Sequence, residues 1–365
     1  MKAAHLPSQR APGARLLVVD SAGGLRHTSR SRLADFLNPG DVLVANDAAT
    51  LPASLSGVHS RTGRAIEVRL AGRRSLAVDD VRDFTAVVFG AGDYRTRTED
   101  RPSPPALQAG DVLVLGPLRA IVLRLQGHPR LVSLRFEGDV DAIWAGIARH
   151  GRPIQYAHVQ PPLALWDVWT RVAALPVAFE PPSAGFVLDW SLLSALKARG
   201  VVFETLTHAA GISSTGDDEL DARLPLDEPY DVPQATVRAI ESASERGGRV
   251  VALGTTVTRA LEHAGSNGPL RAGSGVADQR LGPGTQLNVV DAIISGTHEP
   301  GTSHYELLRA FAGDGVLRHA AQEMERAGYL THEFGDTVLI EAAFSRLPKA
   351  AGPVARRHDP EEQIA

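Results

Sequence analysis

Residues 249–262 read Arg249-Val-Val-Ala-Leu-Gly-Thr-Thr-Val-Thr-Arg-Ala-Leu-Glu262, and this stretch decides the class of fold. The apolar run 250–253 predicts a buried strand, Gly254 predicts a tight turn, and Thr255 or Thr256 is expected to cap the helix that follows. Such a helix start attracts ligands, because its first N–H groups have no partner within the helix. The same pattern fits an ordinary strand-to-helix connection with a capping threonine, and this stretch alone leaves both interpretations open.

The segments around this stretch repeat the alternation of strand and helix. Beyond about residue 151 the apolar periodicity predicts helices at 191–199, 233–246, 305–312 and 316–327, and strands at 201–206 and 338–340. Near the N-terminus, residues 16–19 and 42–45 predict two more strands, with a short helix at 31–37 between them. This alternation is typical of an α/β domain, in which helices cover both faces of a sheet as in a sandwich.

The intervening region has a different pattern. Short apolar runs punctuated by Gly, Pro and Asp occur at 65–70, 85–89, 111–115, 119–125 and 131–136. Strands this short and evenly spaced predict a small antiparallel β-barrel. We therefore expect an α/β main domain formed by residues 15–55 and 151–345, with a barrel domain of residues 56–150 inserted in it. The tail 346–365 has no periodicity and is expected to be disordered.

Composition narrows the chemistry and the location. The chain has 365 residues and no cysteine, which excludes disulfides, thiolate nucleophiles and cysteine-bound metals. No run of about 18 apolar residues is present, and the N-terminus lacks the apolar core of a signal peptide. We therefore expect a cytoplasmic protein without a membrane partner. A net charge of −4 argues against broad wrapping of nucleic acid, although a local basic face would still suffice for phosphate contacts.

Several motifs resemble one family. The stretch from Gly254 to Glu262 resembles the G-T-T-[ST]-x-R-x-L-E signature of the S-adenosylmethionine:tRNA ribosyltransferase-isomerase family of queuosine biosynthesis, and residues 37–47 resemble its P-G-D-x-L-V-x-N-D turn. Further landmarks follow in the family's order at 283–284, 290–294, 298–300, 310–313 and 334–336, so the resemblance covers about residues 15–341.

The resemblance implies both the fold and a reaction. It implies the same barrel-in-α/β arrangement. Ligand pockets favour domain interfaces and the carboxyl ends of sheet strands, so we expect the ligand in the cleft between the domains. The implied reaction transfers and isomerises the ribosyl part of S-adenosylmethionine onto a 7-aminomethyl-7-deazaguanine base of tRNA, giving epoxyqueuosine. S-adenosylmethionine and tRNA are then the substrates, and no external cofactor or metal is required. The chain is expected to act as a monomer.

The same resemblance supplies candidate site residues. Expected catalytic groups are His208, His298 and Glu228, because histidine is the natural proton carrier near neutral pH. Expected substrate-binding residues are Asn46, Asp47, Ser183, Ala184, Gly185, Gly254, Thr255, Thr256, Arg259, Glu262 and Ser303. For His208 a purely structural role is left open, and for the Pro181–Gly185 turn a merely proline-stiffened loop is the alternative.

Departures from the family pattern keep a second function open. Three motif histidines are replaced, by Val187, Arg223 and Leu226, and two motif arginines are replaced by Ala49 and Ser54. These losses are typical of a divergent member. The alternatives are a catalytically degenerate paralogue that binds a nucleoside or RNA, and an enzyme that performs the same chemistry on another acceptor.

The barrel region is the basic part of the chain. Residues 56–150 contain 14 arginines against 11 acidic residues, a net charge of +3 in a chain whose total is −4. Arginine suits bidentate phosphate contacts. We therefore expect tRNA phosphates to contact the barrel through Arg61, Arg64, Arg73, Arg95 and Arg97.

Overall fold

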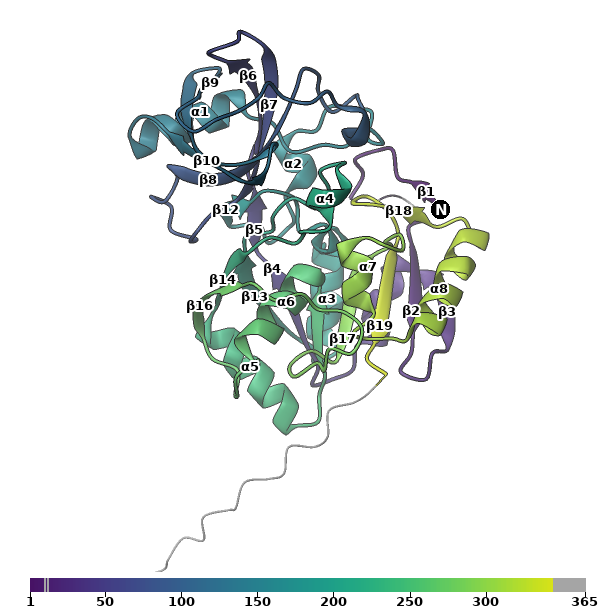
Figure 1. Cartoon of the computed structure of the whole chain (residues 1–365). Coiled ribbons are helices and arrows are strands. Elements are labelled where there is room, and N and C mark those ends of the chain that lie inside the picture. Colours follow the sequence, from purple (N-terminus) through teal and green to yellow (C-terminus); the bar gives the residue numbers. More distant parts are fainter. Residues whose placement is uncertain (10, 12, 344–365) are drawn as a thin grey trace, which may run out of the picture.

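A computed structural model describes residues 1–9, 11 and 13–343, and Figure 1 shows a barrel above a larger α/β unit. The larger unit is built on a nine-stranded sheet with the order β16-β14-β13-β4-β15-β17-β19-β2-β3. In that order the strands are Gly273–Ala277, Glu228–Val232, Val202–His208, Val42–Asn46, Val250–Leu253, Ala292–Gly296, Thr337–Glu341, Arg15–Val19 and Leu25–Ser29. The predicted tail 346–365 lies outside the described residues.

The centre of this sheet is parallel and covered on both faces. Strands β13, β4, β15 and β17 run parallel, and every residue of β4 and β15 is buried. Continuous apolar strands are typical of such double coverage. One face packs against the 3₁₀ helices η1 (Arg30–Phe36) and η3 (Ser183–Val187) and helix α3 (Trp190–Ala198). The other face packs against α5 (Gln234–Glu245), α6 (Thr255–Ala264), α7 (Ser303–Leu308) and α8 (Asp314–Arg326).

The inserted unit is a closed six-stranded antiparallel barrel, as predicted. Its strands follow the order β10-β11-β8-β7-β6-β9, and each neighbouring pair is antiparallel. They are Leu118–His128, Leu131–Phe136, Asp83–Phe89, Ala65–Gly72, Ser54–His59 and Val112–Leu115. Helix α1 (Val140–His150) buries Ile143 and Ile147 in the same core as the barrel interior. The prediction of an α/β fold with an inserted small barrel is therefore confirmed.

Short elements join the two units. Strand β5 (Ala48–Thr50) pairs in parallel with β12 (Leu175–Ala178), and Figure 1 shows this pair between the barrel and the main sheet. Strand β1 (Lys2–Ala3) pairs with β18 (Leu330–Thr331), next to the N-terminus. The remaining short elements are η2 (Thr98–Asp100), α2 (Leu165–Val168) and α4 (Asp218–Asp221). In the described part of the chain, no helix combines the length and apolar character needed to span a bilayer.

Two strands near one edge of the sheet were not predicted from the sequence. Strand β14 reads Glu-Pro-Tyr-Asp-Val and β16 reads Gly-Ser-Gly-Val-Ala, so neither has the apolar alternation that predicts a strand. Both are held by antiparallel pairing, β14 to the end of β13 and β16 to β14. Tertiary pairing overrides weak local propensity here.

Candidate active site

A cavity of about 740 Å³ lies where the sheet faces the barrel. Its wall includes residues that follow β15 and β17, the Ser183–Ala184 part of η3, and residues 97–99 from the barrel. Ligands of α/β proteins commonly bind beyond the carboxyl ends of the parallel strands, and a volume of this size suits a small organic molecule. The predicted position of the site between the two units therefore agrees with the geometry of this cavity.

The start of α6 forms one wall, with an arrangement that differs from the predicted threonine cap. Gly254 itself takes the N-cap position, and among the described residues no side chain supplies the cap hydrogen bond. Its backbone has φ 103° and ψ 162°, a region essentially restricted to glycine. A Cβ on Gly254 would lie 3.2 Å from Cβ of Ala184. The prediction of a capping threonine is wrong, and Thr255 and Thr256 instead line the cavity.

Asn46 and Asp47 lie outside the described cavity wall and hold the segments behind it. The buried Asn46 donates from Nδ2 to the carbonyl of His208 at 2.9 Å and to Oγ1 of Thr256 at 3.3 Å. Asp47 accepts from the hydroxyls of Thr205 and Thr207 at 3.0 and 2.6 Å. These bonds fix the ends of β4 and β13 relative to the start of α6.

Glu228 and Arg259 form an ion pair in the cavity wall. One guanidinium nitrogen of Arg259 donates to Oε2 of Glu228, while Oε1 accepts from the N–H of Gly211 at 2.5 Å. The other guanidinium nitrogens of Arg259 donate to the carbonyls of Ala277 and Gln279, at 2.7 and 3.0 Å. Both ionic groups are buried, so removing either partner would leave an uncompensated charge in the protein interior.

His208 is placed differently from its predicted role. It is 0% exposed, its Nε2 lies 3.4 Å from the carboxylate of Glu228, and the described cavity wall includes Glu228 but not His208. Burial lowers the pKa of His208 to about 4, with nearby Glu228 opposing the shift and Arg259 adding to it. A histidine that stays neutral behind an ion pair does not contact a ligand directly, and the expectation of a ligand-facing proton carrier does not fit this position.

His298 lies in the cavity wall. Its Nε2 is 3.0 Å from Oγ of Ser295, and its ring stacks on His304 with 4.7 Å between ring centroids. Burial holds the pKa of His298 well below its usual value, and the adjacent His304 and His332 shift it in the same direction. This shift favours the neutral imidazole of His298, which presents an unprotonated nitrogen in the cavity wall but is a weaker base than an exposed histidine.

The other predicted binding residues divide into two groups. Ser303 lines the cavity together with Ser183 and Ala184. Glu262 instead accepts the backbone N–H groups of residues 288, 289 and 290 at 2.7–2.9 Å, which anchors a loop behind α6. Gly185 faces the protein interior, where a Cβ would meet Cγ2 of Thr170 at 2.8 Å.

Glu180 and Tyr156 are cavity residues that the sequence patterns missed. The hydroxyl of Tyr156 donates to Oε1 of Glu180, and the same hydroxyl also contacts the carbonyl of Ser214 at 3.1 Å. Burial raises the pKa of Glu180 to about 7. Such a carboxyl group can exchange a proton near neutral pH. In the sequence, the feature that could have pointed to Glu180 is its position directly before the Pro181–Gly185 turn.

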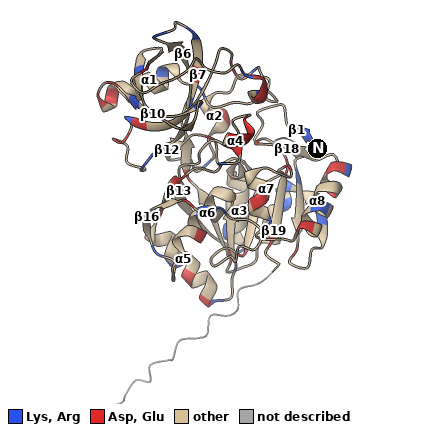
Figure 2. Ribbon diagram, viewed as in Figure 1, with Lys and Arg blue, Asp and Glu red and all other residues tan. Residues whose placement is uncertain are grey.

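The five predicted RNA-contacting arginines are not equivalent. Arg73 is buried and donates to the carbonyls of Ala77 and Asp80, so the proposed phosphate contact does not fit this residue. Exposed Arg61 pairs with Asp111 at 2.9 Å, and Arg95 pairs with Asp93 at 2.7 Å. Arg97 pairs with Glu99 at the cavity mouth, and Arg64 is exposed. Figure 2 shows acidic and basic segments interspersed over the barrel.

Comparison with known proteins identifies the family. The family described as "Queuosine biosynthesis protein" matches residues 1–340. S-adenosylmethionine:tRNA ribosyltransferase-isomerase of Pelobacter propionicus is 31% identical over 93% of this chain and 96% of its own length. The protein of the same name from Azoarcus sp. strain BH72 is 32% identical over 92% and 93%. A solved S-adenosylmethionine tRNA ribosyltransferase from Thermotoga maritima has a TM-score of 0.48 at 24% identity, covering 92% of this chain and 95% of that chain. The chain belongs to the queuosine biosynthesis protein family.

Proposed function

We propose that this protein is an S-adenosylmethionine-dependent tRNA ribosyltransferase-isomerase that acts on 7-aminomethyl-7-deazaguanine in tRNA. The observation that carries the proposal is the cavity at the start of α6, which combines the family's G-T-T signature with walls from both structural units. The relatives named for this activity align over more than nine-tenths of the chain, and the family match over residues 1–340 includes every residue of the described cavity wall.

S-adenosylmethionine is proposed to bind with its methionine end at Gly254, Thr255 and Thr256. The first N–H groups of a ten-residue helix favour a carboxylate there, because they carry partial positive charge without intrahelical partners. A side chain at Gly254 would be strained by φ 103° and would place its Cβ in a tight contact, 3.2 Å from Cβ of Ala184. Ser183, Ala184 and Ser303 then contact the rest of the ligand.

Proton transfer is proposed for His298 and Glu228, with His208 in support. His298 offers a neutral imidazole inside the cavity, and Glu228 offers a carboxylate already oriented by Arg259 and Gly211. His208 contacts that carboxylate from the buried side, so its proposed influence is on the position and charge of Glu228. A correctly placed acid or base contributes typically about 10²- to 10⁴-fold in rate.

The tRNA is proposed to reach the cavity along the barrel, past Arg64, Arg95, Arg97 and Arg61. Surface ion pairs such as Arg97–Glu99 contribute little stability, so these arginines can exchange a carboxylate for a phosphate at small cost. The proposed reaction consumes S-adenosylmethionine as a substrate and requires no metal or other cofactor. We further propose that the protein acts as a monomer in the cytoplasm.

Release of adenine tests this function directly. The purified protein is incubated with S-adenosylmethionine and with tRNA that carries the 7-aminomethyl-7-deazaguanine base, and free adenine and modified nucleoside are quantified. We expect release that depends on the tRNA and falls at least about 100-fold in His298→Ala. Binding of S-adenosylmethionine without adenine release would support the degenerate, binding-only alternative instead.

A further inference from the structure

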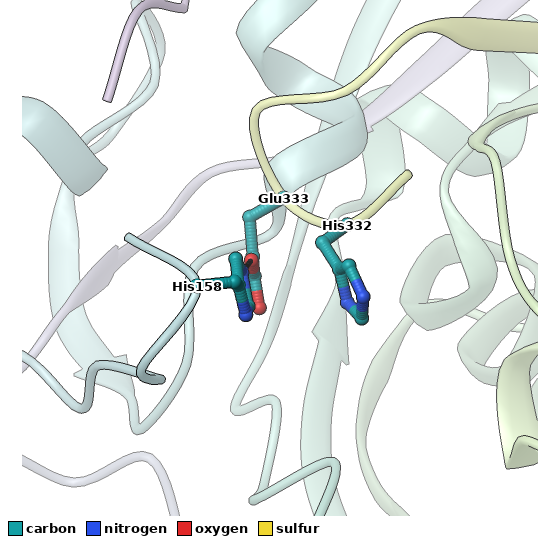
Figure 3. Close-up of side chains that lie close together, drawn as sticks. All are labelled: His158, His332 and Glu333. Carbon is teal, nitrogen blue, oxygen red and sulfur yellow. Dashed lines mark hydrogen bonds and ion pairs between the residues drawn. The ribbon is translucent and has the colours of Figure 1, made fainter. Parts of the chain in front are cut away.

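Three side chains at one edge of the cavity have the chemistry of a metal site. His158 lies between α1 and α2, while His332 and Glu333 lie on the loop between β18 and β19. Figure 3 shows the His158 ring beside the carboxylate of Glu333, with the ring of His332 next to them. One nitrogen from each histidine and one carboxylate oxygen lie within 4.8 Å of one another.

The spacing within this group is close to that of a bound ion. Nε2 of His158 is 3.0 Å from Oε2 of Glu333, and the two histidine rings stack with 4.3 Å between centroids. Zinc binds histidine nitrogen and carboxylate oxygen at about 2.0–2.2 Å in mostly tetrahedral sites, which places two ligand atoms roughly 3.4 Å apart. The His158–Glu333 pair is already within this separation, whereas the exposed His332 ring has to turn out of its stack on His158 to direct a nitrogen at the same ion.

The loop that carries two of the three groups is held firmly. Asp336 accepts from the N–H groups of Leu330 and Arg15 at 2.8 and 2.7 Å, and Gly335 donates to the carbonyl of His332 at 2.9 Å. His332 has φ 68°, and a non-glycine residue rarely adopts this region unless the surrounding structure enforces it. The strained residue therefore projects from a fixed loop, which lowers the entropic cost of assembling a ligand set.

We propose that His158, His332 and Glu333 bind one divalent first-row transition-metal ion, with the remaining coordination positions open to the cavity. Two histidines and one carboxylate with open positions are the donor set of many zinc and non-haem iron(II) sites. All three residues line the cavity, so an ion there can take an oxygen or nitrogen ligand from a molecule inside it. This inference goes beyond the transfer reaction, which consumes no metal.

Zn²⁺ binding to the full chain tests the inference. The protein is treated with chelator, desalted, and titrated with zinc chloride by calorimetry, without S-adenosylmethionine or RNA. We expect one equivalent of Zn²⁺ to bind. His332→Ala and Glu333→Gln should each weaken Zn²⁺ binding by at least about tenfold, because even residues that only orient a metal ligand usually contribute that much. Co²⁺ in place of Zn²⁺ provides visible absorption that reports the ligand geometry.

Controls separate a lost ligand from a lost fold. His319→Ala removes an exposed histidine from α8, outside the described cavity wall, and is expected to bind Zn²⁺ like the unmutated protein. Thermal unfolding without metal is recorded for each variant, because His158→Ala also removes the hydrogen bond to Glu333. Zn²⁺ binding that is absent at sub-millimolar metal, or unchanged in both His332→Ala and Glu333→Gln, overturns the inference. Neither result bears on adenine release, so the proposed function is judged separately.

Discussion

Nε2 of His208 lies 3.4 Å from the carboxylate of Glu228, so the histidine contacts the acid from its buried side while the acid itself lines the cavity. Arg259 donates to the same carboxylate from α6. The three residues come from β13, β14 and α6, and they join the edge of the sheet to the ligand-facing helix. The side chain of His208 is therefore linked to the cavity through Glu228, while its backbone is linked to cavity-lining Thr256 through Asn46.

Acid should destabilise the protein partly through His208. The pKa of His208 is about 4 in the folded protein, against an ordinary value of 6.5. Burial is the main cause of the lower pKa; Glu228 raises the pKa and Arg259 lowers it further. The unfolded chain therefore takes up a proton first as the pH falls. The resulting loss in free energy of unfolding begins near pH 6.5 and levels off below about pH 4. Urea unfolding across this range should show a shallower pH slope for His208→Leu than for the unmutated protein.

His319→Leu is the matched control for this experiment, since His319 is exposed on α8. Its pH slope should match that of the unmutated protein. Equal slopes for His208→Leu and His319→Leu would contradict a depressed pKa at His208.

Gly254→Ala should disturb both stability and ligand binding. Alanine has to adopt φ 103° and ψ 162°, and its Cβ lies 3.2 Å from Ala184. We expect a loss of about 1–3 kcal/mol in the free energy of unfolding, the usual cost of such a strained backbone. Gly247→Ala is the control, because its φ is also positive, at +75°, but nothing lies within 4 Å of its Cβ. The affinity for S-adenosylmethionine should fall in Gly254→Ala and stay normal in Gly247→Ala. Equal affinities in the two variants would show that the helix start is not part of the binding site.

Thr255→Val and Thr256→Val should each weaken S-adenosylmethionine binding by up to about tenfold, since each removes hydrogen bonds worth about 0.5–1.5 kcal/mol. Thr256→Val also removes the acceptor of the Asn46 amide. Thr258→Ser provides a comparison on the same helix, because Thr258 is fully buried and lies outside the described cavity wall. Calorimetric titration should show normal affinity for Thr258→Ser. Normal affinity for both valine variants would show that the ligand binds elsewhere.

Salt dependence should locate the RNA surface. Each arginine that contacts a phosphate contributes about one unit to the slope of log affinity against log salt, because its contact releases counterions. Arg97→Ala and Arg64→Ala should therefore reduce the slope for tRNA by about one unit each. Arg326→Ala on α8 removes an exposed arginine from the α/β unit and should leave the slope unchanged. A slope unaffected by either barrel substitution would place the tRNA on another surface.

Local sequence patterns predicted much of the fold. The apolar run 250–253 followed by Gly254 predicted a buried strand, a turn and a helix, and the structure has β15 and α6 at these positions. Strand β10 and helix α5 were likewise predicted from their periodicity, because neighbouring residues along the chain determine which face of an element is apolar. Strand β14 was missed, since its Glu-Pro-Tyr-Asp-Val sequence forms a strand only through pairing with β13 and β16.

The sequence by itself therefore determined the class of fold, the barrel insertion, the lack of cysteine chemistry and the family signature around Gly254. Only the tertiary structure decided which charged groups meet. Glu228 and Arg259 are 31 residues apart, and His158 and Glu333 are 175 residues apart. Burial of His208 and exposure of His332 likewise follow from the packing of distant segments. Periodicity along a chain encodes the face on which a residue lies, whereas its partners and its desolvation depend on which distant segments pack against that face.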